Sequence, residues 1–132
     1  GHRIALVLEN RAEFFQHFFA LNGLGVCIVP ISAEFVVDEI AYLIDNSEVS
    51  LIVSLLEHIA KISQALGAIN KKVEVRDNES LSDISTAPEI DSARIRRGGI
   101  ADAAILYTSG TTGKPKGCVL PNEFFSVLET GM

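Results

Sequence analysis

Short apolar runs alternate with amphipathic segments along the first 76 residues, and this alternation constrains the fold more than any other feature of the chain. Strand-like runs lie at 3–8, 26–30, 50–53 and 72–75, and segments with a helical period lie between them at 11–21, 35–46 and 59–66. Strands that alternate with helices at this spacing indicate βαβ units with right-handed crossovers. The sequence therefore predicts an α/β fold, with a mainly parallel sheet and flanking helices.

The chain changes character after residue 76. Residues 77–102 are rich in Ser and Asp and also contain Asn78 and Pro88, which predicts a polar surface connection. Arg94, Arg96 and Arg97 could face solvent or form a phosphate-binding patch, and the sequence favours the solvated arrangement. Residues 103–121 predict a strand, a loop and a second strand, and residues 122–132 predict the start of a helix.

The first expected helix carries an aromatic cluster. Phe14, Phe15, Phe18 and Phe19 form a broad apolar stripe there, and we expect them in the core rather than in an acyl pocket. His17 lies among them, and its position favours a helix-face residue over a general base.

The composition excludes several classes of partner. Lys and Arg number 11 against 17 Asp and Glu, a net charge of −6, whereas nucleic acids and anionic membranes bind basic surfaces. We therefore expect no nucleic-acid partner. No apolar run approaches the roughly 20 residues of a membrane-spanning helix, so we expect no integral membrane segment. Cys27 and Cys118 each lie in an apolar run, which favours two reduced, buried thiols of a cytoplasmic protein over a disulfide or a metal pair.

One loop concentrates the residue types that bind a polyphosphate. Residues 108–117 hold three Gly, four hydroxyl side chains and two Lys. Gly permits a backbone with positive φ and lets N–H groups approach an anion, hydroxyls donate to phosphate oxygens or bind Mg²⁺, and Lys adds positive charge. The spacing matches neither the P-loop motif nor the G-x-G-x-x-G dinucleotide motif. From composition alone, this stretch is either a phosphate loop or a flexible surface loop.

The same loop resembles the signature of a known enzyme family. Residues 107–117 read Tyr-Thr-Ser-Gly-Thr-Thr-Gly-Lys-Pro-Lys-Gly, which is similar over eleven positions to the phosphate loop of the adenylate-forming enzymes. That family includes acyl-CoA synthetases, firefly luciferases and the adenylation domains of peptide synthetases. Shorter stretches at 3–10, 13–14, 25–30 and 38–47 resemble the first βαβ segment of the family's large N-terminal domain. The resemblance implies that residues 1–132 are part of an ATP/AMP-binding domain.

The resemblance also implies a reaction and a set of site residues. Such an enzyme is an ATP-dependent acid–thiol ligase of fatty acid metabolism, which uses ATP and Mg²⁺ to turn a carboxylic acid into an acyl-adenylate and passes the acyl group to coenzyme A. The ATP-binding residues expected by resemblance are Thr108, Ser109, Gly110, Thr111, Thr112, Gly113, Lys114, Pro115 and Lys116. Thr108 is the hydroxyl expected near Mg²⁺, and Lys116 is the lysine expected to face phosphate. Donors fixed there would stabilise the charge that grows on the departing pyrophosphate.

Two departures from the family pattern shape what we expect of the chain itself. The family often has Thr-His where this sequence has Pro121 and Asn122, which leaves the acyl subclass open. The family's downstream motifs, among them a ribose-binding acid and a catalytic lysine, do not occur in these 132 residues. We therefore expect an N-terminal fragment that is inactive alone, contains no catalytic residue and self-associates. The alternatives are a non-catalytic binding module with a degenerate phosphate loop, and an adenylation domain of the luciferase-like or peptide-synthetase-like branch.

Overall fold

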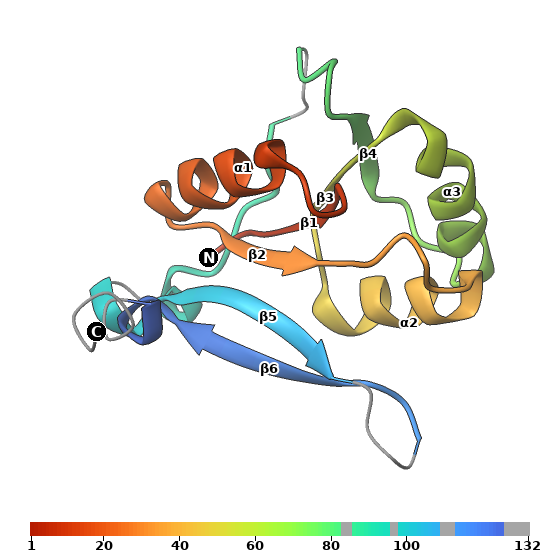
Figure 1. The fold of residues 1–132 in the computed structure, drawn as a ribbon. Coiled ribbons are helices and arrows are strands. Elements are labelled where there is room, and N and C mark those ends of the chain that lie inside the picture. The colour runs from red at the N-terminus through yellow and green to blue at the C-terminus, as the bar shows by residue number, and fades with distance from the viewer. Residues whose placement is uncertain (83–85, 96–97, 109–112, 126–132) are drawn as a thin grey trace.

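The chain forms a six-stranded mixed sheet with helices on both faces, as a computed structural model shows (Figure 1). The structure describes residues 1–82, 86–95, 98–108 and 113–125. The strands are β1 (Arg3–Val7), β2 (Cys27–Pro30), β3 (Leu51–Ser54), β4 (Glu74–Asp77), β5 (Asp102–Thr108) and β6 (Lys116–Pro121). The helices are α1 (Ala12–Gly23), α2 (Val37–Ser47) and α3 (Ile59–Ala68), with 3₁₀ turns η1 (Leu56–His58), η2 (Ser92–Arg94) and η3 (Gly98–Ile100). The predicted α/β class is confirmed.

The strand order β4-β3-β1-β2-β5-β6 shows that the chain winds in two directions. It passes from β1 to the neighbouring β2 through α1, and then returns past β1 to β3 through α2. Because right-handed crossovers in opposite directions lie on opposite faces, α1 covers one face of the sheet and α2 and α3 cover the other. The first five strands are parallel, whereas β6 pairs antiparallel with β5 and forms a hairpin.

The central strand β1 is buried on both faces, as its continuous apolar run predicts. Ala5 and Val7 belong to the core cluster beneath α2 and α3, and Ile4, Leu6 and Leu8 belong to the cluster beneath α1. These five side chains are at most 8% exposed. Both layers of helices are therefore anchored on one strand.

Helix α1 covers its face incompletely, which corrects the prediction that its whole aromatic stripe is core. Phe14 and Phe18 pack against the cluster that contains Leu6, but Phe15 is 56% exposed and Phe19 is 70% exposed. The cause is helical geometry, because neighbouring residues lie about 100° apart around the axis and cannot all face the sheet. His17 is on the helix face as predicted, and its Nε2 lies 2.6 Å from Oδ1 of Asn78.

The two cysteines differ, and the prediction of two buried thiols is wrong for one of them. Both are free, but Cys27 in β2 is buried whereas Cys118 in β6 is exposed. β6 is the last strand of the sheet, so an apolar run there does not guarantee burial. Burial, assisted by the nearby Asp102 carboxylate, raises the pKa of the Cys27 thiol to about 11. That thiol is therefore protonated at neutral pH and a poor nucleophile.

The segment after α3 is shifted relative to its prediction. α3 extends to Ala68, and Asn70 then adopts a left-handed φ of 51°, so β4 begins at Glu74 instead of residue 72. The polar connection that follows holds η2 and η3. Arg96 and Arg97 and the side chain of Arg94 lie outside what the structure describes, so the solvated arrangement of these arginines stays a prediction.

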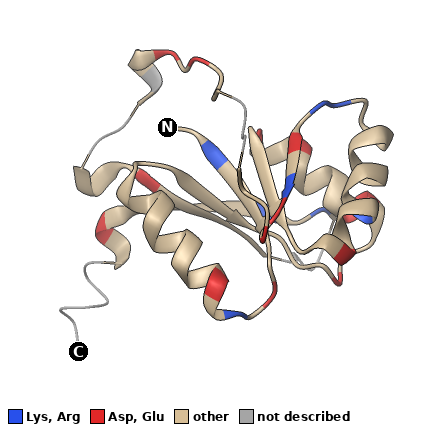
Figure 2. Cartoon of the chain, turned by 90° about the horizontal axis from the view of Figure 1, so that it is seen from above, with Lys and Arg blue, Asp and Glu red and all other residues tan. Residues whose placement is uncertain are grey.

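The charged residues are interspersed over the surface of the described chain. Figure 2 shows acidic and basic residues in short, scattered segments of the chain. None of the described helices has the length and apolar character needed to cross a membrane.

Candidate functional site

The carboxyl ends of β1, β2 and β5 border an open groove of about 920 Å³. Glu9 and Asn10 follow β1 there, residues 30–35 lie at the end of β2 and beyond it, and Thr108 ends β5. α1 and α2 leave this edge toward opposite faces, which makes it a topological switch point, the place where open α/β sheets bind ligands. A smaller cavity of about 190 Å³ lies at the opposite edge, beside Arg3. The larger groove is therefore the candidate site.

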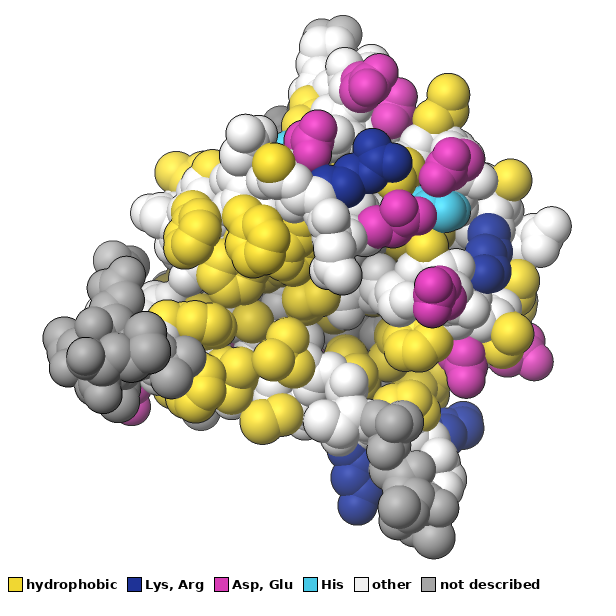
Figure 3. Space-filling view, in the orientation of Figure 1, with side chains coloured by type: hydrophobic (Ala, Val, Ile, Leu, Met, Phe, Trp, Pro, Cys, Tyr) yellow, Lys and Arg dark blue, Asp and Glu magenta, His cyan; other side chains and the backbone are white. Residues whose placement is uncertain are grey.

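The groove is mainly apolar, with acidic residues at its rim. Its lining includes Phe14 and Phe15 of α1 and Leu106 of β5. Figure 3 shows apolar side chains gathered around a hollow on this face of the molecule. Among the acidic residues, Glu9 has its Oε1 atom 2.9 Å from Nε2 of His58, which forms an ion pair when His58 is protonated.

Two of the predicted loop residues lie side by side. Thr108 is the last residue of β5, Lys116 is the first residue of β6, and the two are cross-strand partners. Direct partners in an antiparallel pair point to the same face of the sheet, with Cβ atoms about 4.5–5.5 Å apart. Both residues are exposed, and Thr108 lines the groove. The Thr108 hydroxyl and the Lys116 ammonium group thus lie next to each other on the exposed surface where the loop begins and ends.

Gly113, Lys114 and Pro115 end the loop, and the last two contact helix α2. Gly113 adopts a φ of 96°, the left-handed conformation for which a glycine was expected. The Lys114 Nζ atom lies 4.9 Å from the centroid of the Tyr42 ring. The Pro115 carbonyl accepts a hydrogen bond from the Tyr42 hydroxyl at 3.1 Å. The remaining predicted residues, Ser109, Gly110, Thr111 and Thr112, lie outside the described part of the chain.

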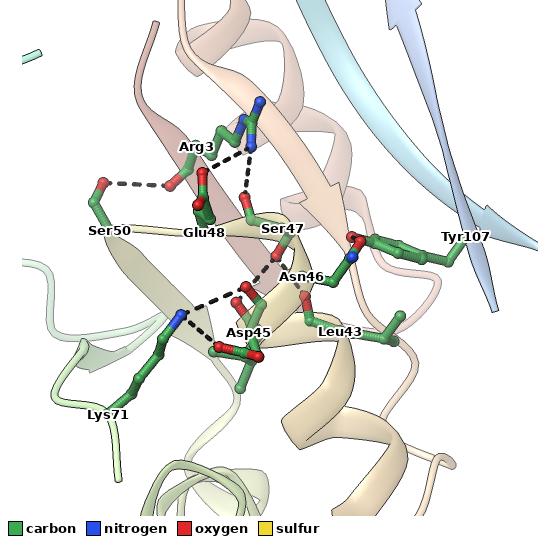
Figure 4. A network of polar contacts seen from close by, with 10 residues as sticks. Arg3, Leu43, Asp45, Asn46, Ser47, Glu48, Ser50, Lys71 and Tyr107 are labelled. Atoms are coloured by element: carbon green, nitrogen blue, oxygen red, sulfur yellow. Dashed lines mark hydrogen bonds and ion pairs between the residues drawn. The ribbon is translucent and has the colours of Figure 1, made fainter. Parts of the chain in front are cut away.

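Helix α2 contributes contacts that the sequence did not indicate. Besides Tyr42, it supplies Asn46, whose Oδ1 accepts a hydrogen bond from the Tyr107 hydroxyl at 2.7 Å (Figure 4). Burial raises the pKa of Tyr107, so its hydroxyl is protonated and able to donate at neutral pH. The helical period places Tyr42 and Asn46 on one face, because they are four residues apart. Sequence alone gives no sign that this face meets the hairpin.

The carboxyl end of α2 is itself firmly held (Figure 4). The Arg3 guanidinium donates to the Ser47 carbonyl at 3.0 Å, and Nζ of Lys71 lies 2.7 Å from Oδ1 of Asp45. The Ser47 hydroxyl donates to the Leu43 carbonyl at 2.6 Å. Positive side chains at this end satisfy carbonyl groups that have no partner inside the helix and complement the helix dipole. The helix that contacts the loop is therefore a fixed support.

Comparison with known proteins identifies the family. The family model described as "AMP-binding enzyme" matches residues 1–128. This chain belongs to the AMP-binding enzyme family. The predicted membership of the adenylate-forming enzymes is thereby confirmed.

Curated relatives of this AMP-binding chain are CoA ligases. It is 32% identical over 142 aligned residues to the crotonobetaine/carnitine–CoA ligase of Salmonella paratyphi A, and the match covers 91% of this chain and 26% of that protein. It is 34% identical over 134 aligned residues to the enzyme of the same name from Citrobacter koseri, with the same two coverages of 91% and 26%. The chain thus spans about a quarter of the length of the curated relatives that it matches.

Solved structures share the fold. ATP-bound MatB from Rhodopseudomonas palustris has a TM-score of 0.74 at 29% identity, covering 98% of this chain and 26% of its own. A malonyl-CoA ligase in a ternary product complex with methylmalonyl-CoA and AMP has a TM-score of 0.70 at 28% identity, with coverages of 96% and 25%. A luciferase-like enzyme from the mealworm Zophobas morio has a TM-score of 0.79 at 19% identity, covering 99% and 33%, and this likeness concerns the fold alone.

Proposed function

We propose that this AMP-binding chain forms the phosphate-binding part of an ATP-dependent acid–thiol ligase, which activates a carboxylic acid as an acyl-adenylate and transfers it to coenzyme A. The observation that carries the proposal is the pairing of Thr108 with Lys116 at the carboxyl edge of the sheet. The CoA ligases among the curated relatives support the thiol acceptor, and the ATP-bound structure of MatB supports the nucleotide.

The proposed chemistry assigns work to both residues. A carboxylate oxygen attacks the α-phosphorus of ATP, the bond from phosphorus to the bridging oxygen breaks, and pyrophosphate leaves with added negative charge. Lys116 donates to that charge, which grows in the transition state and so receives more stabilisation there than in the ground state. In the second half, the coenzyme A sulfur attacks the acyl carbon and AMP leaves.

The assignment of Thr108 as a magnesium ligand rests on the chemistry of its side-chain oxygen. Thr108 offers an exposed hydroxyl oxygen, a hard ligand suited to Mg²⁺, beside the groove. When bound, Mg²⁺ neutralises phosphate charge. The other residues proposed for the phosphate loop are Ser109, Gly110, Thr111, Thr112, Gly113, Lys114 and Pro115, with Lys116 as the lysine proposed to contact phosphate. The compartment proposed for the ligase is the cytoplasm, and its proposed setting is fatty acid metabolism.

Exchange of labelled pyrophosphate into ATP tests the ligase. The protein, produced at the full length of its curated relatives, should exchange pyrophosphate into ATP only when a carboxylic acid is added. The panel of acids should contain fatty acids, malonate and betaine acids, because the residues of the phosphate loop do not determine which acid is activated. We expect no exchange from residues 1–132 alone, because the ribose-binding acid and the catalytic lysine that the family resemblance implies do not occur in them. A full-length protein that is silent with every acid would contradict the ligase and favour a non-catalytic module. Exchange by residues 1–132 that is lost in Lys116→Ala would contradict the expected inactivity.

Self-association of the isolated chain remains a further part of the proposal. Phe15 and Phe19 are 56% and 70% exposed, and Phe124 is 43% exposed. Apolar side chains gathered on one face favour association when nothing else covers them. Sedimentation equilibrium should show dimers or larger species as concentration rises, and a 14.2 kDa monomer throughout would contradict this.

A further inference from the structure

One helix holds both limbs of the β5–β6 hairpin. On the limb that enters the loop, Tyr107 donates to Asn46 of α2. On the limb that leaves it, Pro115 accepts from Tyr42, and Lys114 lies over the ring of Tyr42. These three contacts come from side chains one helical turn apart, so a single face of α2 spans the base of the loop.

Among the described residues, these contacts lie on one face of the hairpin. Cross-strand pairing puts Tyr107 opposite Gly117, and these residues face α2. A Cβ atom on Gly117 would lie 3.1 Å from the Tyr107 ring, so the absence of a side chain leaves room for that ring beside β6. Side chains alternate along a strand, so Thr108 and Lys116, each one residue away, face the other side. The two lysines of the loop are therefore directed to opposite faces.

Tyr42 is well placed to hold its partners still. Its ring packs against the core cluster that includes Ile40 and Leu43, so it is not a mobile surface side chain. Its hydroxyl and its ring face engage two consecutive residues, Lys114 and Pro115, at the same time. A side chain fixed in this way reduces the conformational freedom of Lys114 and Pro115 before any ligand binds. Such a reduction is the basis of preorganisation.

We propose that Tyr42 is a positioning residue that determines which of the two lysines of the phosphate loop faces the phosphates. It holds Lys114 against α2 as a structural latch, and this leaves Lys116, beside Thr108, as the lysine presented to the phosphates. The role in catalysis rests on the proposed ligase function, whereas the latch itself is a property of residues 1–132.

Lysine footprinting on residues 1–132 tests the latch without ATP. Trace acetylation with acetic anhydride, followed by peptide mass spectrometry, gives the rate at Lys114 relative to Lys72, which is exposed on another part of the chain. Replacement of the ring in Tyr42→Leu should raise the Lys114 rate about two- to fivefold, as expected for loss of a cation–π contact at an exposed site. Tyr42→Phe is the matched control, because it keeps the ring and should leave the Lys114 rate unchanged.

A second measurement keeps the test decisive if Tyr42→Leu does not fold. In the NMR spectrum of the unmodified chain, the ring of Tyr42 should shift the ε-methylene protons of Lys114 upfield from those of Lys72. An unshifted Lys114 resonance, or equal Lys114 acetylation in the folded Tyr42→Leu variant and the unmodified chain, would overturn the latch.

The catalytic role is measured separately in the full-length protein. Tyr42→Leu should raise the KM for ATP about two- to tenfold while leaving the KM for the acid unchanged, because it removes both the hydrogen bond to Pro115 and the ring contact with Lys114. Tyr42→Phe should give a smaller rise. An unchanged KM for ATP in an active Tyr42→Leu enzyme would overturn the positioning role even if the footprint shows the latch. A full-length protein without exchange activity would remove the proposed function and with it the catalytic role, while the footprint would still decide the latch.

Discussion

Replacement of Lys116 by alanine is expected to lower pyrophosphate exchange in the full-length protein by about 10²–10³-fold, the usual effect of removing one donor to charge that develops in a transition state. Lys116 is exposed at the start of β6, next to Thr108, and projects on the groove side of the hairpin. The loss should appear mainly in kcat, because the added charge exists only as pyrophosphate departs.

The matched control is the other lysine of the loop. Lys114 carries the same charge two residues away but lies over the ring of Tyr42. Lys114→Ala should therefore cost much less exchange activity than Lys116→Ala. Equal losses, or a larger loss for Lys114→Ala, would show that the assignment of the two lysines is wrong.

A second large effect is expected on stability. Leu43 lies in α2, is 0% exposed and belongs to the core cluster beneath the sheet. Leu43→Ala should lower the free energy of unfolding by about 2–5 kcal/mol, because it removes buried apolar area and leaves a cavity. Urea unfolding followed by circular dichroism measures the change.

Leu24→Ala is the control for that substitution. The same atoms are removed, but Leu24 follows α1 and is 79% exposed. Its effect should stay within about 0.5 kcal/mol, as for most surface substitutions. A loss at Leu24 as large as that at Leu43 would mean that the core has been placed on the wrong face of the helices.

The alternation of strands and helices could be predicted from the sequence because burial on two faces leaves a strong mark. Residues 4–8 are apolar at every position, as a strand covered on both sides requires. The order of the strands in the sheet is harder to predict from the sequence. β6 pairs antiparallel with β5 because a short loop joins them, and the outward side of β6 is left as an edge.

Exposure at the edge of the sheet could not be predicted from local sequence. Cys118 and Val119 sit in an apolar run that reads like a core strand, yet Val119 is 46% exposed and Cys118 is exposed too. Phe15 and Phe19 mislead in the same way, because hydrophobic character does not reveal which neighbouring surface is present. Burial in these places depends on what packs there.

The candidate site was predicted in part. The resemblance to the adenylate-forming enzymes pointed to residues 108–116, and the pairing of Thr108 with Lys116 follows from the hairpin register. The support from Tyr42 and Asn46 could not be predicted, because it depends on how α2 crosses a strand more than 60 residues later in the chain. Long-range contacts of this kind leave no periodic signal.

The central claim is that this loop receives the phosphates of ATP through Lys116. An ATP analogue with an acyl group on its terminal phosphate tests it most directly, because such a reagent acylates a lysine that lies beside the bound phosphates. Treatment of the full-length protein, followed by tandem mass spectrometry, locates the modified lysine. We predict acylation at Lys116 in preference to Lys114, and loss of labelling when excess ATP is present. Labelling confined to lysines outside residues 108–116, or labelling of Lys116 that ATP does not reduce, would contradict the assignment of this loop to ATP.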